Sequence, residues 1–250
     1  MNPSPLTFCP VALVDIQRGG VIHGPWREAP SHVGLPDHEV HLWLANVEQQ
    51  DGRPESFQHL LSEPEKTCAA KFHFERDRIR YTARHVVLRQ LTGQYLQRTP
   101  NEIRFVENSF GKPGLTTDSV EGLEFNLSKS EEWAAYGFVL RRRIGIDVEK
   151  VRRDFDCEGI VTRFFHPREA MYIAESPPRS RAGRFFACWT LKEAFIKAQG
   201  VGLQRPLVEF DLSPLVREGS GEFTDRDGSK WLCATVDPVA ELAAGVVVES

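Results

Sequence analysis

The stretch Ile144-Gly145-Ile146-Asp147-Val148-Glu149 alternates apolar residues with a glycine and two acids. Successive side chains of a β-strand point to opposite faces, so the alternation predicts a strand with Asp147 and Glu149 on one face and Ile146 and Val148 on the other. Two carboxylates on one face repel each other unless a cation lies between them. Mg²⁺ binds through one or two carboxylates together with substrate phosphates, so this face is a candidate metal site. The alternative is a solvated strand face that is balanced by the basic residues that follow it.

The segments around this strand predict antiparallel sheet. Residues 133–140 read as a strand, and the three arginines at 141–143 read as a turn, so we expect a hairpin with the strand at 144–148. Residues 40–45 and 243–248 also have the composition of strands.

Helical spacing of apolar residues predicts a long helix with a charged face over residues 60–97. A short helix is expected from Pro167, because proline suits the first helical turn. A longer helix over 184–199 is expected to end at Gly200, because glycine readily adopts the left-handed conformation of a helix C-terminus. The first forty residues show no clear periodicity and are expected to be irregular or an extension. The mixture of helices and strands indicates an α+β chain.

The helix expected over 184–199 carries a second group of polar residues. Trp189, Glu193 and Lys197 follow one another at i, i+4 spacing, so a carboxylate and an amine share one helical face. The simplest interpretation of this pair alone is a surface Glu–Lys contact worth a few tenths of a kcal/mol. Near the strand carboxylates, however, Glu193 would supply a third acidic ligand and the lysine would face a metal-bound phosphate.

The two patterns occur together, since the Gly-Ile-Asp-Val-Glu strand is followed some forty residues later by Trp-x-x-Lys-Glu-Ala-x-x-Lys-x-x-Gly. In this combination the chain resembles the Sfp-type 4'-phosphopantetheinyl transferases. Gly111-Lys112-Pro113, Phe125-Asn126-Leu127-Ser128-Lys129-Ser130 and the basic segment 71–81, which contains Arg80, are similar to further family elements. Lys129 stands where the family usually has histidine. A lysine keeps a positive charge for phosphate but does not titrate near neutral pH.

The resemblance implies an α+β fold of two pseudo-symmetric halves of antiparallel sheet packed with helices, 1–142 and 143–250, with coenzyme A and the metal in the cleft between them. The first half would contribute to binding the coenzyme A nucleotide, and the second would carry the metal-binding and catalytic motifs. The residues implied to bind coenzyme A are Arg80, Lys112, Ser128, Lys129, Asp147 and Lys197. Those implied to hold Mg²⁺ are Asp147, Glu149 and Glu193, and those implied to act in catalysis are Glu193, Lys197 and Lys192.

The activity implied by the resemblance is transfer of the 4'-phosphopantetheine group from coenzyme A to a serine of an apo acyl or peptidyl carrier protein, with release of 3',5'-ADP. The carriers of fatty acid, polyketide and nonribosomal peptide biosynthesis are all candidates. Glu193, directly or through a metal-bound water, is expected to accept the serine proton, and Lys197 is the alternative base. Lys192 and Lys197 are expected to stabilise charge on the phosphate oxygens.

Two rival functions stay open from the residues alone. A Mg²⁺-dependent phosphodiesterase acting on nucleotides would use the same carboxylates and would hydrolyse coenzyme A without any carrier. A non-catalytic module would bind carrier proteins or coenzyme A without metal-dependent transfer. The chain contains no Gly-x-x-x-x-Gly-Lys-[Ser/Thr], Gly-x-Ser-x-Gly or His-Glu-x-x-His pattern, so the usual NTPase, hydrolase and zinc protease sites are not indicated.

Composition limits the classes of partner and the cellular compartments that we expect for the protein. A formal net charge of -4 argues against a surface built for nucleic acid, and no apolar run is long enough to cross a bilayer. Five scattered cysteines without a Cys-x-x-Cys pair indicate neither a disulfide framework nor a zinc site. We therefore expect a cytoplasmic, unanchored monomer. The Pro- and Arg-rich segment 176–183 is expected to be a loop, either a plain connection or a contact for the carrier.

Overall fold

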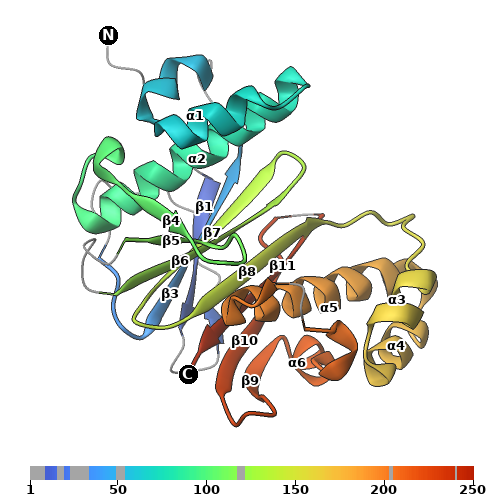
Figure 1. Ribbon diagram of the computed structural model, residues 1–250. Helices are drawn as coiled ribbons and strands as arrows, with labels where there is room; N and C mark the ends of the chain where they lie inside the picture. The colour runs from blue at the N-terminus through green and yellow to red at the C-terminus, as the bar shows by residue number, and fades with distance from the viewer. Residues whose placement is uncertain are drawn as a thin grey trace.

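Two antiparallel sheets pack face to face, and each carries one long helix on its outer face (Figure 1). The structure, a computed structural model, describes residues 9–15, 20–22, 34–48, 54–116, 122–202, 205–239 and 241–250. The strands of the first sheet, in spatial order, are β2 (Gly20–Ile22), β1 (Cys9–Asp15), β3 (Glu39–Asn46), β7 (Trp133–Leu140) and β6 (Leu123–Ser130). Those of the second are β8 (Ile144–Lys150), β11 (Leu242–Glu249), β10 (Lys230–Val236) and β9 (Ser220–Thr224).

The two long helices, α2 (Glu75–Leu96) and α5 (Pro178–Gln199), have 22 residues each and lie on opposite sides of the molecule (Figure 1). Each ends where one residue adopts a left-handed conformation, Gln97 after α2 and Gly200 after α5. The shorter elements are η1 (Pro54–Leu60), α1 (Glu63–Ala70), η2 (Pro100–Glu102), β4 (Phe105–Glu107), β5 (Pro113–Leu115), α3 (Glu158–Phe164), α4 (Pro167–Ala174), η4 (Leu207–Glu209) and α6 (Ser213–Glu218).

The core between the sheets is formed by apolar side chains from β3 and β7 on one side and β8, β10 and β11 on the other. Leu42, Val148 and Val246, for example, are at most 2% exposed. On the outer face of the second sheet, α5 lies directly on glycine. A Cβ at Gly145 would lie 1.9 Å from the carbonyl oxygen of Ala194. Only glycine therefore lets α5 come this close to β8.

The predicted α+β fold with antiparallel sheets and helices is confirmed. The strand at the centre of the sequence pattern is β8, and α4, α5 and β11 occur where they were expected, although α5 begins six residues earlier than 184. The early start makes most of the expected loop 176–183 helical. In the described part of the chain, no helix is both long and apolar enough to span a membrane.

Three predictions about secondary structure are wrong. The hairpin of 133–148 does not form, because both edges of β7 are occupied by β3 and β6, and β8 pairs with β11 instead. The expected helix 60–97 is broken after Ala70, where Phe72 folds back so that its ring lies 5.3 Å from that of Tyr81 on α2. The first forty residues are not wholly irregular, since they supply β1 and β2.

The division of the chain at 142/143 has a counterpart in the sheets. All strands of the five-stranded sheet precede Arg141, and all strands of the four-stranded sheet follow Arg143. The assignment of two domains to 1–142 and 143–250 stays a prediction.

Candidate active site

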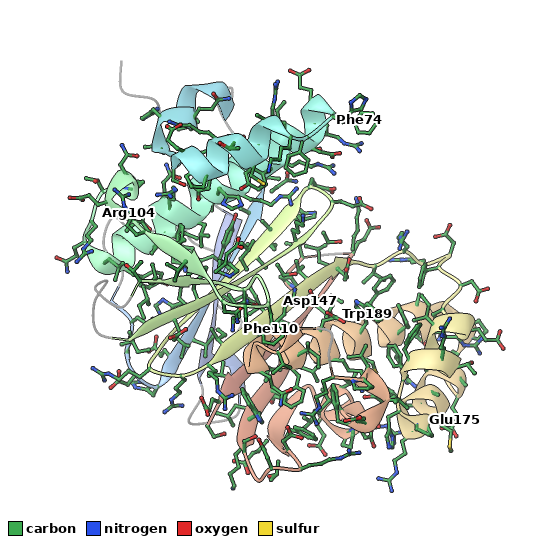
Figure 2. The ribbon with its side chains drawn as sticks, in the orientation of Figure 1. Phe74, Arg104, Phe110, Asp147, Glu175 and Trp189 are labelled. Atoms are coloured by element: carbon green, nitrogen blue, oxygen red, sulfur yellow. The ribbon has the colours of Figure 1, made fainter. Side chains whose placement is uncertain are left out.

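Asp147 lies on β8 near the middle of the molecule, between the positions of Phe110 and Trp189 (Figure 2). Its carboxylate is almost completely buried, and its two oxygens differ sharply. Oδ1 accepts hydrogen bonds from Lys197 Nζ at 2.7 Å and from Ser128 Oγ at 2.8 Å. Oδ2 is buried and has no hydrogen-bond partner among the residues that the structure describes. A buried carboxylate oxygen without a partner is costly, so this atom is well placed to bind a cation.

Glu149 and Glu193 share the electrostatic environment of Asp147. Glu149 lies two residues along β8 and accepts a hydrogen bond from Ser130 Oγ at 2.7 Å. Burial raises the pKa of all three carboxyl groups, and the charge of Asp147 raises the pKa of Glu149 and Glu193 further. A bound cation would relieve this repulsion.

In the structure, the side chains of the three acids do not by themselves form a complete metal coordination shell. Among the described residues, no group of three or more His, Cys, Asp or Glu side chains has metal-binding geometry. The donor set nevertheless fits Mg²⁺, which prefers carboxylate oxygens and completes its shell with water and substrate phosphates. Asp147, Glu149 and Glu193 are therefore the residues that would hold it, with Asp147 Oδ2 as the available oxygen.

Lys197 reaches the site from α5 and is the cation nearest to Asp147. Its ammonium group also donates to Ser128 Oγ at 3.0 Å, and its side chain stays 31% exposed. The sequence-predicted convergence of Asp147, Ser128 and Lys197 is thus present in the structure. Glu193 joins them one helical turn earlier on the same face of α5.

Lys192 is not brought to this site. Its side chain is fully buried and its Nζ donates to Glu169 Oε1 at 2.9 Å and to the carbonyl oxygen of Phe210 at 2.6 Å. One residue along a helix is a rotation of about 100°, so the neighbour of Glu193 faces away from the carboxylates. Lys192 instead ties α5 to α4 and to the segment that precedes α6.

Lys112 lies beside the site, and backbone carbonyl oxygens accept the hydrogen bonds of its ammonium group. Its Nζ donates to the carbonyl oxygens of Ile144 at 2.9 Å and Lys197 at 2.8 Å, and burial lowers its pKa to about 8. A cavity of about 290 Å³ is lined by Lys112, Phe110, Glu193 and Lys197, among others. Lys112 therefore helps to form the wall of a cavity that reaches two catalytic candidates.

Basic residues of α2 and β6 approach the site, since Lys129 lies close enough to Lys197 for their charges to interact. Arg80 donates from Nε to Glu48 Oε1 at 2.8 Å, so its charge is already paired. Arg84, one turn later, has a buried Nε that finds no hydrogen-bond partner in the described part of the chain. Partial burial lowers the pKa of Lys129, and the positive charges of Arg84 and Lys197 lower it further. Arg84 was not among the sequence candidates, although its i, i+4 spacing from Arg80 was a usable signal.

A second, larger cavity of about 720 Å³ lies in the first half of the chain. Its lining includes Tyr81 and His85 from α2, whose rings stack with centroids 4.1 Å apart. Pro113, which follows Lys112, lines both cavities. The loop 111–113 thus lies between the carboxylate site and this larger space.

Comparison with known proteins identifies the family. A sequence model of the 4'-phosphopantetheinyl transferase superfamily matches residues 143–246, and one of the 4'-phosphopantetheinyl transferase N-terminal region matches residues 52–137. The chain is 37% identical over 191 residues to 4'-phosphopantetheinyl transferase HetI of Nostoc sp., which covers 76% of this chain and 81% of HetI. The chain belongs to the 4'-phosphopantetheinyl transferase superfamily.

Two further relatives of this transferase superfamily member are more distant. The chain is 29% identical to 4'-phosphopantetheinyl transferase Sfp of Bacillus subtilis, over 63% of this chain and 68% of that protein. It is 33% identical to the human L-aminoadipate-semialdehyde dehydrogenase-phosphopantetheinyl transferase, over 60% of this chain and 52% of that one. The resemblance seen in the motifs is confirmed, and so is the predicted function, 4'-phosphopantetheinyl transfer to carrier proteins.

Proposed function

We propose that this transferase is Mg²⁺-dependent and moves the 4'-phosphopantetheine group of coenzyme A to a serine of an apo carrier protein, releasing 3',5'-ADP. The observation that carries the proposal is the unpartnered Oδ2 of Asp147, buried beside two further carboxylates and one lysine. Asp147, Glu149 and Glu193 would hold Mg²⁺, which supplies charge neutralisation for the coenzyme A pyrophosphate.

Glu193 is the group that we expect to accept the proton of the carrier serine. The serine oxygen forms a bond to the phosphorus that bears pantetheine, the bond from that phosphorus to the 3',5'-ADP oxygen breaks, and the serine proton passes to Glu193. In the metal-free protein, burial and the neighbouring charges of Asp147 and Glu149 raise the pKa of Glu193, so this carboxyl group has a raised affinity for a proton before the metal binds.

Lys197 is expected to donate to the phosphate oxygens as their charge changes, because its ammonium group lies next to Asp147 and keeps access to solvent. Lys192 has no direct part in this proposal, since its ammonium group is buried against Glu169. It would act by fixing the rotation of α5. The earlier expectation that Lys192 contacts phosphate is replaced by this positional role.

The remaining phosphate contacts are proposed for the basic residues of the first half. Lys129 and Arg84 are cations close to each other, and no ion pair is formed by either one within the described ranges. Lys112 lines the adjoining cavity, and the stacked rings of Tyr81 and His85 in the larger cavity offer a surface for a nucleobase. Arg80 is a weaker candidate, because Glu48 already pairs with its charge.

The cellular compartment and the oligomeric state of the protein are also proposals. Cys157, Cys188 and Cys233 are buried free thiols, which suits a reducing cytoplasm. The two halves bring carboxylates and cations together within one chain, so we propose that a monomer is sufficient for activity.

The test is intact-mass spectrometry of an apo carrier protein incubated with this protein, coenzyme A and Mg²⁺. We expect the carrier to gain one phosphopantetheine, and we expect EDTA or Asp147→Ala to abolish the gain. Carriers of the fatty acid, polyketide and nonribosomal peptide types would be compared in parallel. Hydrolysis of coenzyme A without a carrier would instead favour a phosphodiesterase, and binding of coenzyme A without transfer would favour a non-catalytic module.

A further inference from the structure

The edge strands β6 and β8 meet side by side, but side chains rather than backbone groups of β6 receive the N–H groups of β8. The acceptors occupy alternate positions, and the pairs are Asn126 Oδ1 with Ile146 N at 2.8 Å, Ser128 Oγ with Val148 N at 3.3 Å, and Ser130 Oγ with Lys150 N at 3.0 Å. Each pair is separated by 20 residues, so the two strands run parallel in constant register. We call these three side chains the β6 ladder.

The two serines of the β6 ladder each make a second contact with β8, to a carboxylate. Ser128 Oγ donates to Asp147 Oδ1 at 2.8 Å, and Ser130 Oγ donates to Glu149 Oε2 at 2.7 Å. A hydroxyl group has one proton and two lone pairs. Because each serine oxygen accepts from a backbone N–H, its proton is left for the carboxylate.

This arrangement fixes one oxygen of each acid and leaves the other one available. At Asp147 the fixed oxygen is Oδ1, and the other one, Oδ2, is buried without a partner in the described ranges. At Glu149 the fixed oxygen is Oε2. Groups that hydrogen-bond to metal-binding side chains orient them and tune their affinity.

We infer that Ser130 and Asn126 are positioning residues of the transfer reaction. Asn126 sets the register between the two sheets, and Ser130 orients Glu149 for the metal. This inference rests on the proposed Mg²⁺ site. It assigns a role to two residues that contact neither substrate nor metal themselves, and it explains why polar side chains interrupt a strand otherwise packed into the core.

Ser130→Ala tests the inference, with Ser213→Ala as a matched control. Ser213 is also a buried serine, and its Oγ also donates to a carboxylate oxygen, Asp211 Oδ1, at 2.7 Å. Asp211 is not among the proposed metal ligands. Both variants therefore lose a hydrogen bond of the same kind, and only one of them should affect the metal site.

Three measurements distinguish the proposed orientation of Glu149 by Ser130 from a general loss of fold stability. By calorimetric titration with Mg²⁺ in the presence of coenzyme A, we expect Ser130→Ala to bind the metal about tenfold more weakly, with Ser213→Ala unchanged. In transfer assays the Mg²⁺ concentration for half-activation should rise similarly while kcat at saturating Mg²⁺ is largely retained. By hydrogen exchange, the Lys150 amide should exchange faster in Ser130→Ala only.

Wild-type Mg²⁺ affinity in Ser130→Ala would overturn the positioning role, whether or not the Lys150 amide exchanges faster. An equal loss of affinity in Ser213→Ala would also overturn it, because the effect would then follow stability alone. Failure of the proposed function is distinct from both. It would appear as a wild-type protein that modifies no carrier, while the hydrogen-exchange comparison would still report on the β6 ladder.

Discussion

At the scale of single residues, the clearest contrast is between two lysines five positions apart on α5. Lys197 faces Asp147 and stays partly exposed, whereas Lys192 is buried against Glu169 and the carbonyl oxygen of Phe210. The side chain of Lys192 is fully buried, so a substrate could contact it only if this part of the molecule unfolded. Two lysines of one sequence motif therefore have different surroundings, one at the proposed active site and one in the core.

Lys192→Met should destabilise the fold strongly, because it leaves the Glu169 carboxylate buried without its partner. Removing one member of a buried pair costs about 3–5 kcal/mol. The measurement is the free energy of unfolding from urea denaturation. The double variant Lys192→Met/Glu169→Leu should recover much of the loss, and a single variant as stable as the wild type would contradict the structural role.

Glu193→Gln should stabilise the metal-free protein at neutral pH. The folded-state pKa of Glu193 is raised above its ordinary value of 4.5, so the folded state holds its proton more tightly than the unfolded state. Stability from this group is therefore present at low pH and is lost as pH rises above 4.5 through the raised pKa. The measurement is denaturation without metal at several pH values. The free energy of unfolding of the variant should rise relative to that of the wild type as pH rises. If the difference in the free energy of unfolding stayed constant with pH, the pKa of Glu193 would not be raised in the folded state.

At the scale of elements, the contact between α5 and β8 depends on the absence of a side chain. The same is true of β11, where a Cβ at Gly245 would lie 2.5 Å from the carbonyl oxygen of Thr190. Two neighbouring strands thus offer the helix a smooth surface. The close approach brings Glu193 and Lys197 within reach of the β8 carboxylates.

Gly145→Ala should therefore reduce activity and stability together. The new methyl group would collide with the backbone of Ala194, so the helix must move away from the strand. Overpacking of this kind typically costs about 1–3 kcal/mol. Carrier modification and the urea midpoint would be measured side by side, with Gly183→Ala on the exposed start of α5 as the control, because its Cβ would meet nothing within 4 Å. Wild-type activity in Gly145→Ala would show that the close packing is unnecessary.

The sequence was informative about elements whose signals are local. The alternation at 144–149 and the spacing of Glu193 and Lys197 both describe real faces, and Gly200 ends α5 as its backbone freedom predicts. The hairpin failed because β7 pairs instead with β6, across the turn at 131–132, and with β3 from residues 39–46, a distant partner that the local turn signal at 141–143 does not reveal. The role of the β6 ladder was missed for the same reason, since its partners lie 20 residues away.

At the scale of the whole molecule, the two sheets share one core, although their strands come from separate parts of the sequence. Leu42 from β3 and Val246 from β11 belong to the same buried cluster. The carboxylates of the proposed site come from β8 and α5, and the cations that form no ion pair with other described residues come from α2 and β6. Three core clusters lie within one half each, but the cluster between the sheets and the proposed site both need residues from the two halves.

Unfolding should consequently be a single cooperative transition. Circular dichroism and tryptophan fluorescence should give coincident urea curves, since both sheets lose the shared core together. A fragment of residues 143–250 should lack a cooperative transition, because its sheet would expose Ile146 and Val148 to water. Two separated transitions, or a stably folded fragment, would support independent domains at the 142/143 boundary.

The meeting of β6 and β8 has a consequence for solubility. They are two of the four terminal strands of the large sheets, and a terminal strand with open backbone groups is a template for aggregation. Here the side chains of one edge cap the N–H groups of the other. The contacts proposed to orient the carboxylates therefore also protect two strand edges, so damage to them would promote self-association as well as weaken metal binding.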